Sequence, residues 1–488
     1  MKRAIILTVL LALSFAPMAA AGPGDTLWTR TYGGSNDDKG ESVQQVSDGG
    51  YIIAGGTDSF GAGSYDVYLL KTDPSGDTLW TRTYGGSNWD YGWSVEQNPD
   101  GGYIIAGYTE SFGAGGADVY LLKTDSSGDT LWTRAYGGSD WDYGYSVRET
   151  SDGGYVIAGY TTSFGAGGAD VYLVKTDSSG DTLWTRAYGG SDSDGGYSIQ
   201  QTTDGGYIIA GYTSSFGAGY SDVYLVKTDS SGDSLWTRTY GGSYDDYGWS
   251  VQQTSDGGYI IAGETESFGA GSDDVYLVKT DSSGDTLWTR THGGSDYDRG
   301  YSVQQTSDGG YVVAGFTMSF GAGNDDVYLL KTDSSGDTLW TRTYGGSDHD
   351  AGSSVQQTSD GGYIIAGFTG SFGAGWNDVY LIKTVGEVVE VDDPEFEKPL
   401  PASTSLSQSY PNPFNVGTVI SYQLPEASEV KLEVYNLLGE KVATLVHGAE
   451  EAGYRSVTWD ASEVSSGLYF YKLSTGDFTE TRRMILVK

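Results

Sequence analysis

Four pairs of aspartates separated by one residue occur along the sequence at intervals of 52 or 104 residues. Carboxylate oxygens are ligands that Ca²⁺ accepts, and two carboxylates flanking a sugar could also act in glycoside hydrolysis. The second aspartate has a structural alternative, because a carboxylate in a turn accepts hydrogen bonds from backbone N–H groups. Three further copies of the segment lack the first aspartate, so both interpretations stay open. The calcium candidates are Asp140, Asp142, Asp192, Asp194, Asp296, Asp298, Asp348 and Asp350.

Tryptophan and tyrosine occur in the same segments and in one nearby loop. Aromatic rings mixed with Asp and Asn stack on sugar rings and bond sugar hydroxyls, and they are equally the residues that dominate protein interfaces. The sequence therefore leaves a glycan and a protein ligand open. The predicted ligand-binding residues are Trp89, Trp93, Trp141, Tyr143, Tyr145, Tyr244, Trp249, Tyr297 and Trp376.

Residues for acid–base or nucleophilic catalysis are few. The sequence has no cysteine and three histidines, His292, His349 and His447, none of them in an arrangement typical of a triad or a metal site. An active site in a repeated sequence would be an exception to the repeat, and none stands out. We therefore predict a binding protein without enzymatic activity or a cofactor, calcium remaining possible. The alternatives are a polysaccharide-degrading enzyme and a purely structural surface or adhesin protein.

These residues belong to a unit of 52 residues that occurs seven times. In the third copy, residues 146–150, 155–159, 170–175 and 182–186 are rich in β-branched and aromatic residues, which predicts four short strands, a to d. Asp-Gly-Gly joins a to b and Ser-Gly-Asp joins c to d, as in hairpin turns. Such units repeated seven times predict a β-propeller. One tryptophan marks each copy, at Trp28, Trp80, Trp132, Trp184, Trp236, Trp288 and Trp340.

The two ends of the repeat region predict a closed ring. The region begins at residues 25–28 with strand d alone and ends at residues 378–384 with strand c and no following d. Seven complete blades form only if the N-terminal strand completes the last blade, which also removes an exposed sheet edge. We expect an all-β protein with a closed seven-bladed propeller over residues 22–384.

Variation among the copies is concentrated at one end of each blade. The a–b and c–d turns are nearly constant, whereas the d–a loop keeps the frame Gly-Gly-Ser-x-x-Asp-x-Gly-x-Ser and changes the positions marked x. The b–c loop varies likewise after Ser-Phe-Gly-Ala-Gly. Both loops belong to one face of a propeller, so we expect this face to bind the ligand. The alternative explanation of this variation is structural, because long loops tolerate substitutions that tight turns do not.

Charge and the N-terminal sequence restrict partners and location. The 65 Asp and Glu residues outnumber 27 Lys and Arg, and the net charge of −38 disfavours nucleic acids and anionic membranes. Residues 1–21 combine a basic start, an apolar run and Ala19-Ala20-Ala21, which is typical of a cleaved signal peptide. No other stretch is long and apolar enough to span a membrane. We expect an exported protein without membrane insertion.

Two motifs of the repeat resemble those of known propellers. Ser179-Gly180-Asp181-Thr182-Leu183-Trp184 is similar to the blade signature of quinoprotein-type propellers, in which the tryptophan docks one blade on the next. The aspartate is one residue closer here, and Lys replaces an expected Ala. Asp-x-Gly-x-Ser resembles the Asp-box turn of sialidase-type propellers, although the preceding Ser is one residue further away. These resemblances imply the fold and a structural role for the fixed aspartate, and they imply no quinone cofactor.

The chain changes character after residue 384. Residues 385–405 are rich in Glu, Asp, Val and Pro, which predicts an acidic extended linker. Residues 406–488 contain short β-rich runs whose spacing suits an immunoglobulin-like sandwich.

Four motifs of this last segment resemble the C-terminal sorting domain of type IX secretion substrates. They are Tyr410-Pro411-Asn412-Pro413-Phe414-Asn415, Val434-Tyr435-Asn436-Leu437-Leu438-Gly439, Ser466-Gly467-Leu468-Tyr469-Phe470-Tyr471 and Arg483-Met484-Ile485-Leu486-Val487-Lys488. One departure is Val416, where the family often has Pro. The resemblance implies that residues 406–488 are recognised by the type IX secretion machinery. It also implies that the protein is secreted, or displayed on the outer-membrane surface, by a Gram-negative bacterium.

Overall fold

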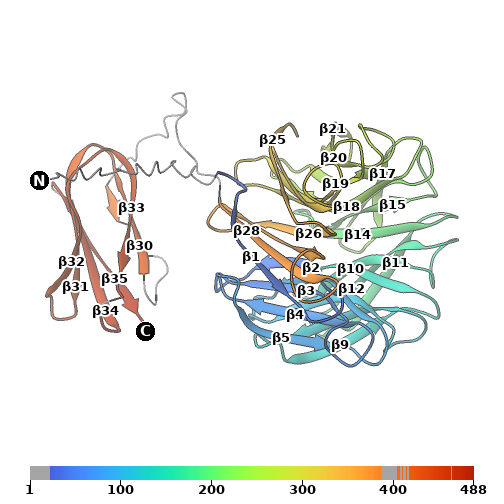
Figure 1. Ribbon diagram of the computed structural model, residues 1–488, viewed down its shortest axis with the longest axis horizontal. Helices are drawn as coiled ribbons and strands as arrows, with labels where there is room; N and C mark the ends of the chain where they lie inside the picture. Colours follow the sequence, from blue (N-terminus) through green and yellow to red (C-terminus); the bar gives the residue numbers. More distant parts are fainter. Residues whose placement is uncertain are drawn as a thin grey trace, which may run out of the picture. The chain divides into compact units, whose positions relative to one another are not determined.

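The computed structural model of the protein describes residues 22–386, 404–406, 409, 414, 417–462, 464–476 and 478–487. Throughout these residues the regular secondary structure is β-strand, with no helix. The chain divides into two compact units, residues 1–388 and 389–488, whose strands are drawn in Figure 1. The predicted signal peptide and most of the predicted linker lie outside the described residues.

Each repeat forms one four-stranded antiparallel sheet, or blade. The innermost (a) strands of neighbouring blades contact one another in a closed ring. These a strands are β2 (Asp38–Gln45), β6 (Asp90–Gln97), β10 (Asp142–Glu149), β14 (Asp194–Gln201), β18 (Asp246–Gln253), β22 (Asp298–Gln305) and β26 (Asp350–Gln357). The b strands are β3 (Tyr51–Thr57), β7 (Tyr103–Thr109), β11 (Tyr155–Thr161), β15 (Tyr207–Thr213), β19 (Tyr259–Thr265), β23 (Tyr311–Thr317) and β27 (Tyr363–Thr369).

Strands c and d complete each blade toward the outside. The c strands are β4 (Asp66–Thr72), β8 (Asp118–Thr124), β12 (Asp170–Thr176), β16 (Asp222–Thr228), β20 (Asp274–Thr280), β24 (Asp326–Thr332) and β28 (Asp378–Thr384). The outermost d strands are β5 (Thr78–Tyr84), β9 (Thr130–Tyr136), β13 (Thr182–Tyr188), β17 (Ser234–Tyr240), β21 (Thr286–His292), β25 (Thr338–Tyr344) and β1 (Thr26–Tyr32).

Packing between neighbouring blades supplies the core of the propeller. Ile104 of one blade packs in the same cluster as Ile157 of the next, and burial of such side chains is the main driving force for docking the sheets. The d strand adds Trp132, whose ring centroid lies 6.0 Å from that of Tyr155 in the next blade. The Arg134 guanidinium lies 5.4 Å from the Trp132 ring centroid as a cation–π neighbour. Equivalent contacts recur at all seven interfaces.

The seventh blade is built from both ends of the repeat region. Strand β1 pairs antiparallel with β28 and is the outer strand of the sheet β1-β28-β27-β26. Arg342 of the preceding blade forms an ion pair with Asp25 at 3.0 Å. The closed seven-bladed ring predicted from the sequence is confirmed.

A ring of hydrogen bonds ties the a strands together around the axis. The Ser146 hydroxyl accepts a hydrogen bond from the Ile199 backbone N–H of the next blade at 3.3 Å. Its counterpart is present at each of the other six interfaces. The serine that ends the frame Asp-x-Gly-x-Ser therefore holds neighbouring blades together.

The a strands begin four residues earlier than the sequence predicted. Strand β10 starts at Asp142, and its register against β11 shifts between Gly144 and Ser146, so Tyr145 is the extra residue of a β-bulge. The same shift occurs in all seven blades. The last variable positions of the predicted d–a loop are therefore strand residues, and a bulge turns their side chains in a new direction.

Two glycines make the bulge possible by letting the strands approach closely. A Cβ atom on Gly159 would lie 1.6 Å from the Tyr143 carbonyl oxygen, and one on Gly144 would lie 2.9 Å from Val119 Cγ1. A larger residue at Gly159 would separate the a and b strands, and one at Gly144 would press against Val119 of β8 in the preceding blade. The constancy of these glycines in the repeat thus has a steric cause.

The second unit packs two sheets face to face. One sheet has the order β29-β30-β33 and the other β32-β31-β34-β35. Trp459 lies in the core between them, with its ring centroid 5.6 Å from that of Phe414 and 5.3 Å from that of Tyr469. This is the predicted immunoglobulin-like sandwich. Its strands are β29 (Ser405–Leu406), β30 (Gly417–Leu424), β31 (Ser428–Asn436), β32 (Lys441–Glu450), β33 (Gly453–Asp460), β34 (Gly467–Thr475) and β35 (Phe478–Leu486).

Candidate functional site

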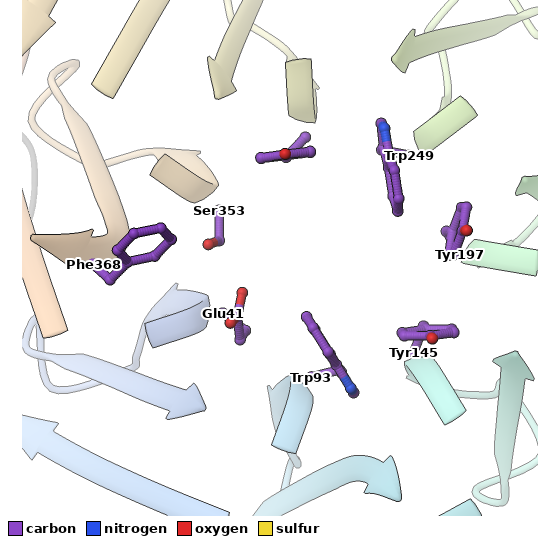
Figure 2. Close-up of a pocket in the computed structure, with 8 residues that line it drawn as sticks. Glu41, Trp93, Tyr145, Tyr197, Trp249, Ser353 and Phe368 are labelled. Carbon is purple, nitrogen blue, oxygen red and sulfur yellow. The ribbon is translucent and has the colours of Figure 1, made fainter. Parts of the chain in front are cut away.

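The extra residue of each bulge lines a cavity on the propeller axis, at the end that carries the d–a and b–c loops. Figure 2 shows the labelled side chains converging on this space, which we call the axial cavity. Its volume is about 410 Å³, within the range of roughly 300–1,000 Å³ that is usual for small-ligand sites. The lining consists of Glu41, Trp93, Tyr145, Tyr197, Trp249, Tyr301 and Ser353, one from each blade, and Phe368 of β27.

Five neighbouring blades give the axial cavity an aromatic wall. The ring centroids of Trp93 and Tyr145 are 5.3 Å apart, and those of Tyr145 and Tyr197 are 5.2 Å apart. The rings of Tyr197 and Trp249 stack at 4.1 Å, and Trp249 meets Tyr301 edge-on at 5.5 Å. Aromatic pairs at these distances stabilise one another, so the wall is held in place before any ligand arrives.

The remaining two blades interrupt this wall with polar side chains. Figure 2 shows Glu41 and Ser353 across the cavity from Tyr197. The Tyr91 hydroxyl donates a hydrogen bond to Glu41 Oε1 at 2.6 Å. Burial, followed by the nearby Glu41 charge, raises the pKa of Tyr91 well above its ordinary value, so Tyr91 stays protonated and keeps donating. One carboxylate oxygen of Glu41 is therefore held in place.

A second carboxylate lies behind the aromatic wall. Glu264 of β19 is 4% exposed, and its Oε2 accepts a hydrogen bond from the Trp249 indole N–H at 3.2 Å. Arg299 lies 3.0 Å from the same oxygen and 2.6 Å from the Asp273 carboxylate. Burial raises the pKa of Glu264 to about 7, against the opposing effect of the Arg299 charge. Glu264 is not among the cavity-lining residues, and its contact is with the edge of Trp249.

Three of the nine predicted ligand-binding residues lie at the axis, and a fourth contacts one of them. Trp93, Tyr145 and Trp249 line the axial cavity, and Tyr143 stacks beside Tyr145 with a centroid distance of 6.3 Å. The other five have large exposed side chains in the d–a and b–c loops: Trp89, Trp141, Tyr244, Tyr297 and Trp376.

The d–a and b–c loops lie against each other. The Asp142 backbone N–H donates to the Ala117 carbonyl of the preceding blade at 2.7 Å, and equivalent bonds form at all seven interfaces. The exposed aromatic side chains and the mouth of the axial cavity therefore belong to one face.

Sequence reasoning missed five of the eight lining residues: Glu41, Tyr197, Tyr301, Ser353 and Phe368. The first four share their place in the repeat with Trp93, between the Gly and the Ser of the frame. Reading that one position through all seven copies would have found them. Phe368 lies on a b strand, and no signal in the loops pointed to it.

The fixed aspartates of the frame are buried and bonded to the backbone. Asp142 Oδ2 accepts hydrogen bonds from the Gly138 N–H and the Ser163 hydroxyl, each at 2.7 Å. The backbone bond recurs in the other six copies, which is the structural role that the Asp-box resemblance implies. Asp140, the first member of its pair, is exposed, as are Asp192, Asp296 and Asp348.

Calcium binding by these pairs stays a prediction. In the part of the chain that the structure describes, no three acidic or histidine side chains gather in a group able to hold a metal ion.

Residues 408–488 match the family described as Secretion system C-terminal sorting domain. The family predicted from the four C-terminal motifs is confirmed. The chain is thus a type IX secreted β-propeller protein, located outside the cell or on the outer-membrane surface of a Gram-negative bacterium. The described residues contain no helix suited to crossing a lipid bilayer.

One curated relative is the regulatory protein FlaEY of Caulobacter vibrioides. It is 28% identical over 173 residues, which are 33% of this chain and 16% of FlaEY.

Several solved structures share features of the chain at low identity. PorZ, described as an essential bacterial surface component of the type IX secretion system of Porphyromonas gingivalis, has a TM-score of 0.41 and 13% identity over 97% of this chain and 61% of PorZ. Sqt1 from Chaetomium thermophilum has a TM-score of 0.41 and 11% identity over 71% of this chain and 83% of Sqt1. The PQQ-bound aldose sugar dehydrogenase from Streptomyces coelicolor has a TM-score of 0.33 and 12% identity over 60% of this chain and 93% of the enzyme. Similarities of this degree carry no argument about activity or partners.

Proposed function

We propose that this exported propeller is a binding module that takes a glycan or protein ligand into the axial cavity. The exposed aromatic residues of the d–a and b–c loops add contacts around the mouth. The observation that carries the proposal is diversification of one position in otherwise nearly identical blades. At the bulge, the seven copies hold two Trp, three Tyr, one Glu and one Ser, while the preceding Gly and the following Ser never change.

A second cavity, lined by residues further along the a strands, supports this argument by contrast. Its lining includes the position two residues after the constant serine, which is glutamine in five of seven blades. Gln200 Oε1, for example, accepts a hydrogen bond from the backbone N–H of Gln253 in the next blade at 2.6 Å. Positions that bond one blade to the next are thus kept nearly uniform. The bulge position has diversified toward the aromatic and polar side chains that are usual in ligand sites.

The geometry favours binding over hydrolysis. Glycosidases commonly need two carboxyl groups that face the same bond, and Glu41 is the one carboxylate among the eight lining residues. The Glu264 carboxylate accepts a hydrogen bond from Trp249 and pairs with Arg299 behind the aromatic wall. A polysaccharide-degrading activity therefore has less support than binding.

The test is a screen of the mature full-length protein against glycan and peptide arrays, with calcium and again with chelator. Each saturable hit is then titrated against Trp249→Ala, Trp376→Ala and Leu235→Ala. Leu235 is an exposed residue of the outer strand β17, so its substitution is the control. We expect Trp249→Ala to weaken binding by about tenfold or more, as for a central aromatic contact, and Leu235→Ala to leave it unchanged. Trp376→Ala, in an exposed loop, should have an intermediate effect.

Trp249→Phe keeps an aromatic ring against Tyr197 and serves as the second variant if the alanine variant melts early. Binding that survives both substitutions in folded protein would contradict the proposal. A blank screen in both buffers would favour the structural alternative. Loss of binding with chelator would show that binding needs a divalent cation, as the calcium prediction for the paired aspartates expects.

A further inference from the structure

Glu41 is the lining residue that packing does not explain. At the equivalent position five blades carry an aromatic ring and one carries serine, so the scaffold does not require a carboxylate there. Among the described ion pairs none includes Glu41, and its hydrogen-bond partner is the Tyr91 hydroxyl. Lys39, two residues earlier on β2, instead has its ammonium 4.7 Å from the Phe368 ring centroid. Glu41 thus brings a negative charge to the axial cavity without a salt-bridge partner among the described residues.

The rest of the lining favours a positive partner for this carboxylate. The faces of Trp and Tyr rings attract cations, and the attraction strengthens where water is excluded. Trp93 and Trp249 point into the same space as Glu41 (Figure 2). A cation in the axial cavity would therefore meet an aromatic wall on one side and a fixed carboxylate on the other.

The surface around the mouth carries charge of the same sign as Glu41. Arg299, the other basic residue near the cavity, is already paired with Glu264 and Asp273. The net charge of the whole chain is −38, and such a field concentrates cations at the cavity. Exposed carboxylates in the d–a and b–c loops are Asp58, Glu110, Asp140, Asp192, Glu266, Asp296 and Asp348.

We propose that the group bound in the axial cavity is an alkylammonium ion, with Glu41 as its counter-ion and the aromatic wall as its cation–π surface. The ion is the head group of a small amine or the end of a lysine side chain. This inference rests on the proposed function, because it names the ligand chemistry of the same cavity. A neutral sugar would use the stacking surface and donate hydroxyl hydrogen bonds to Glu41, but it would leave the Glu41 charge without a counter-ion and would gain nothing from the cation–π surface.

The experiment compares choline with 3,3-dimethylbutan-1-ol, which has the same shape without the charge. Both are titrated calorimetrically into the mature full-length protein, and Nα-acetyl-lysine amide is the third probe. We expect choline to bind about tenfold or more tightly than the alcohol. Glu41→Gln should reduce this preference by weakening choline alone, and the share that remains is the cation–π contribution of the aromatic wall. Glu41→Ser introduces the residue that Ser353 supplies in the neighbouring blade and is the second variant. Glu110→Gln removes one exposed carboxylate of the same face that does not line the cavity; as the control, it should weaken choline binding by less than about twofold.

Three outcomes separate this inference from the proposed function. Equal binding of choline and the alcohol, with loss of both in Trp249→Ala, would overturn the alkylammonium inference and leave the axial cavity as the binding site. If neither choline nor the lysine amide binds while a glycan binds in a way that requires Trp249, the alkylammonium inference is likewise overturned and the axial cavity remains the binding site. Tighter binding of the lysine amide than of choline would support the inference and assign the ion to a lysine side chain.

Discussion

Replacing Glu264 by glutamine tests the electrostatics behind the aromatic wall. The carboxylate is 4% exposed and contacts the Trp249 indole N–H and Arg299. Glutamine keeps the size of the side chain and a carbonyl oxygen for the indole, but it never carries a charge. We expect Glu264→Gln to change the pH dependence of stability while leaving the fold intact.

The sign follows from proton binding in the folded and unfolded chains. Glutamate in the unfolded chain titrates near its ordinary pKa of 4.5, whereas the pKa of folded Glu264 is about 7. Between these two pKa values the folded protein binds more protons than the unfolded chain does. The stabilisation that results is complete below the pKa of the unfolded chain and is lost as the pH rises through the pKa of folded Glu264. At about 1.4 kcal/mol per pKa unit, the full shift corresponds to about 3 kcal/mol. The free energy of unfolding of Glu264→Gln, minus that of the wild type, should therefore rise by nearly this amount between about pH 5 and about pH 8.

The assay is urea unfolding of both proteins at the two pH values, followed by tryptophan fluorescence and circular dichroism. Other titrating groups cancel in the difference between variant and wild type. Glu110→Gln is the matched control, because Glu110 is exposed on the same face, and its difference should stay within about 0.5 kcal/mol. If the difference in free energy of unfolding between Glu264→Gln and the wild type also stays constant between the two pH values, burial does not raise the pKa of Glu264 and the argument is refuted.

Two further predictions concern the scaffold. Gly159→Ala, whose Cβ would lie 1.6 Å from the Tyr143 carbonyl oxygen, should lower the free energy of unfolding by about 3 kcal/mol or more. Gly153→Ala, in an open turn at φ +81°, should cost about 1 kcal/mol, and equal costs in urea unfolding would contradict the bulge argument. Deleting residues 22–32 removes β1 and exposes the edge of β28, so we expect a lower melting temperature and self-association by size-exclusion chromatography. An unchanged melting temperature together with elution as a monomer would show that ring closure contributes little to stability.

The fold could be predicted because the same pattern of strands and turns occurs in seven copies. Runs of β-branched and aromatic residues between constant turns predict four strands in each copy. The lone strand at the start of the repeat region can complete the last blade, so a closed ring is predicted. The start of the a strand could not be predicted in the same way. Variation between copies suggests a loop, whereas Tyr145 varies because it faces an open axis where no neighbouring backbone constrains it. The close approach at Gly159 that creates the bulge is a long-range contact without a local sequence signal.

The candidate site was only partly predictable for a related reason. Choosing residues by type found Trp93 and Trp249 but passed over Glu41 and Ser353, which are ordinary surface residues in isolation. Their importance comes from convergence, because side chains 52 residues apart in sequence meet at one axis. Glu264 does depart from the repeat, because five of the other six copies have Tyr or Phe at its place in the b strand, but choosing loop residues by type passed over it. Its contact with Trp249 shows where that departure matters.

Ring symmetry decides where ligand specificity can arise in this molecule. Seven nearly identical blades would by themselves build a symmetric cavity, which cannot orient an asymmetric ligand. The bulge is held by glycine contacts and by the serine hydroxyl bonds between blades, so the inserted side chain can change without altering the strand that carries it. Glu41 and Ser353 belong to adjacent blades and open the aromatic wall on one side only. Under the proposed function, a ligand entering along the axis would meet the aromatic rings of five neighbouring blades and the Glu41 carboxylate of another blade, and this asymmetry would favour one orientation.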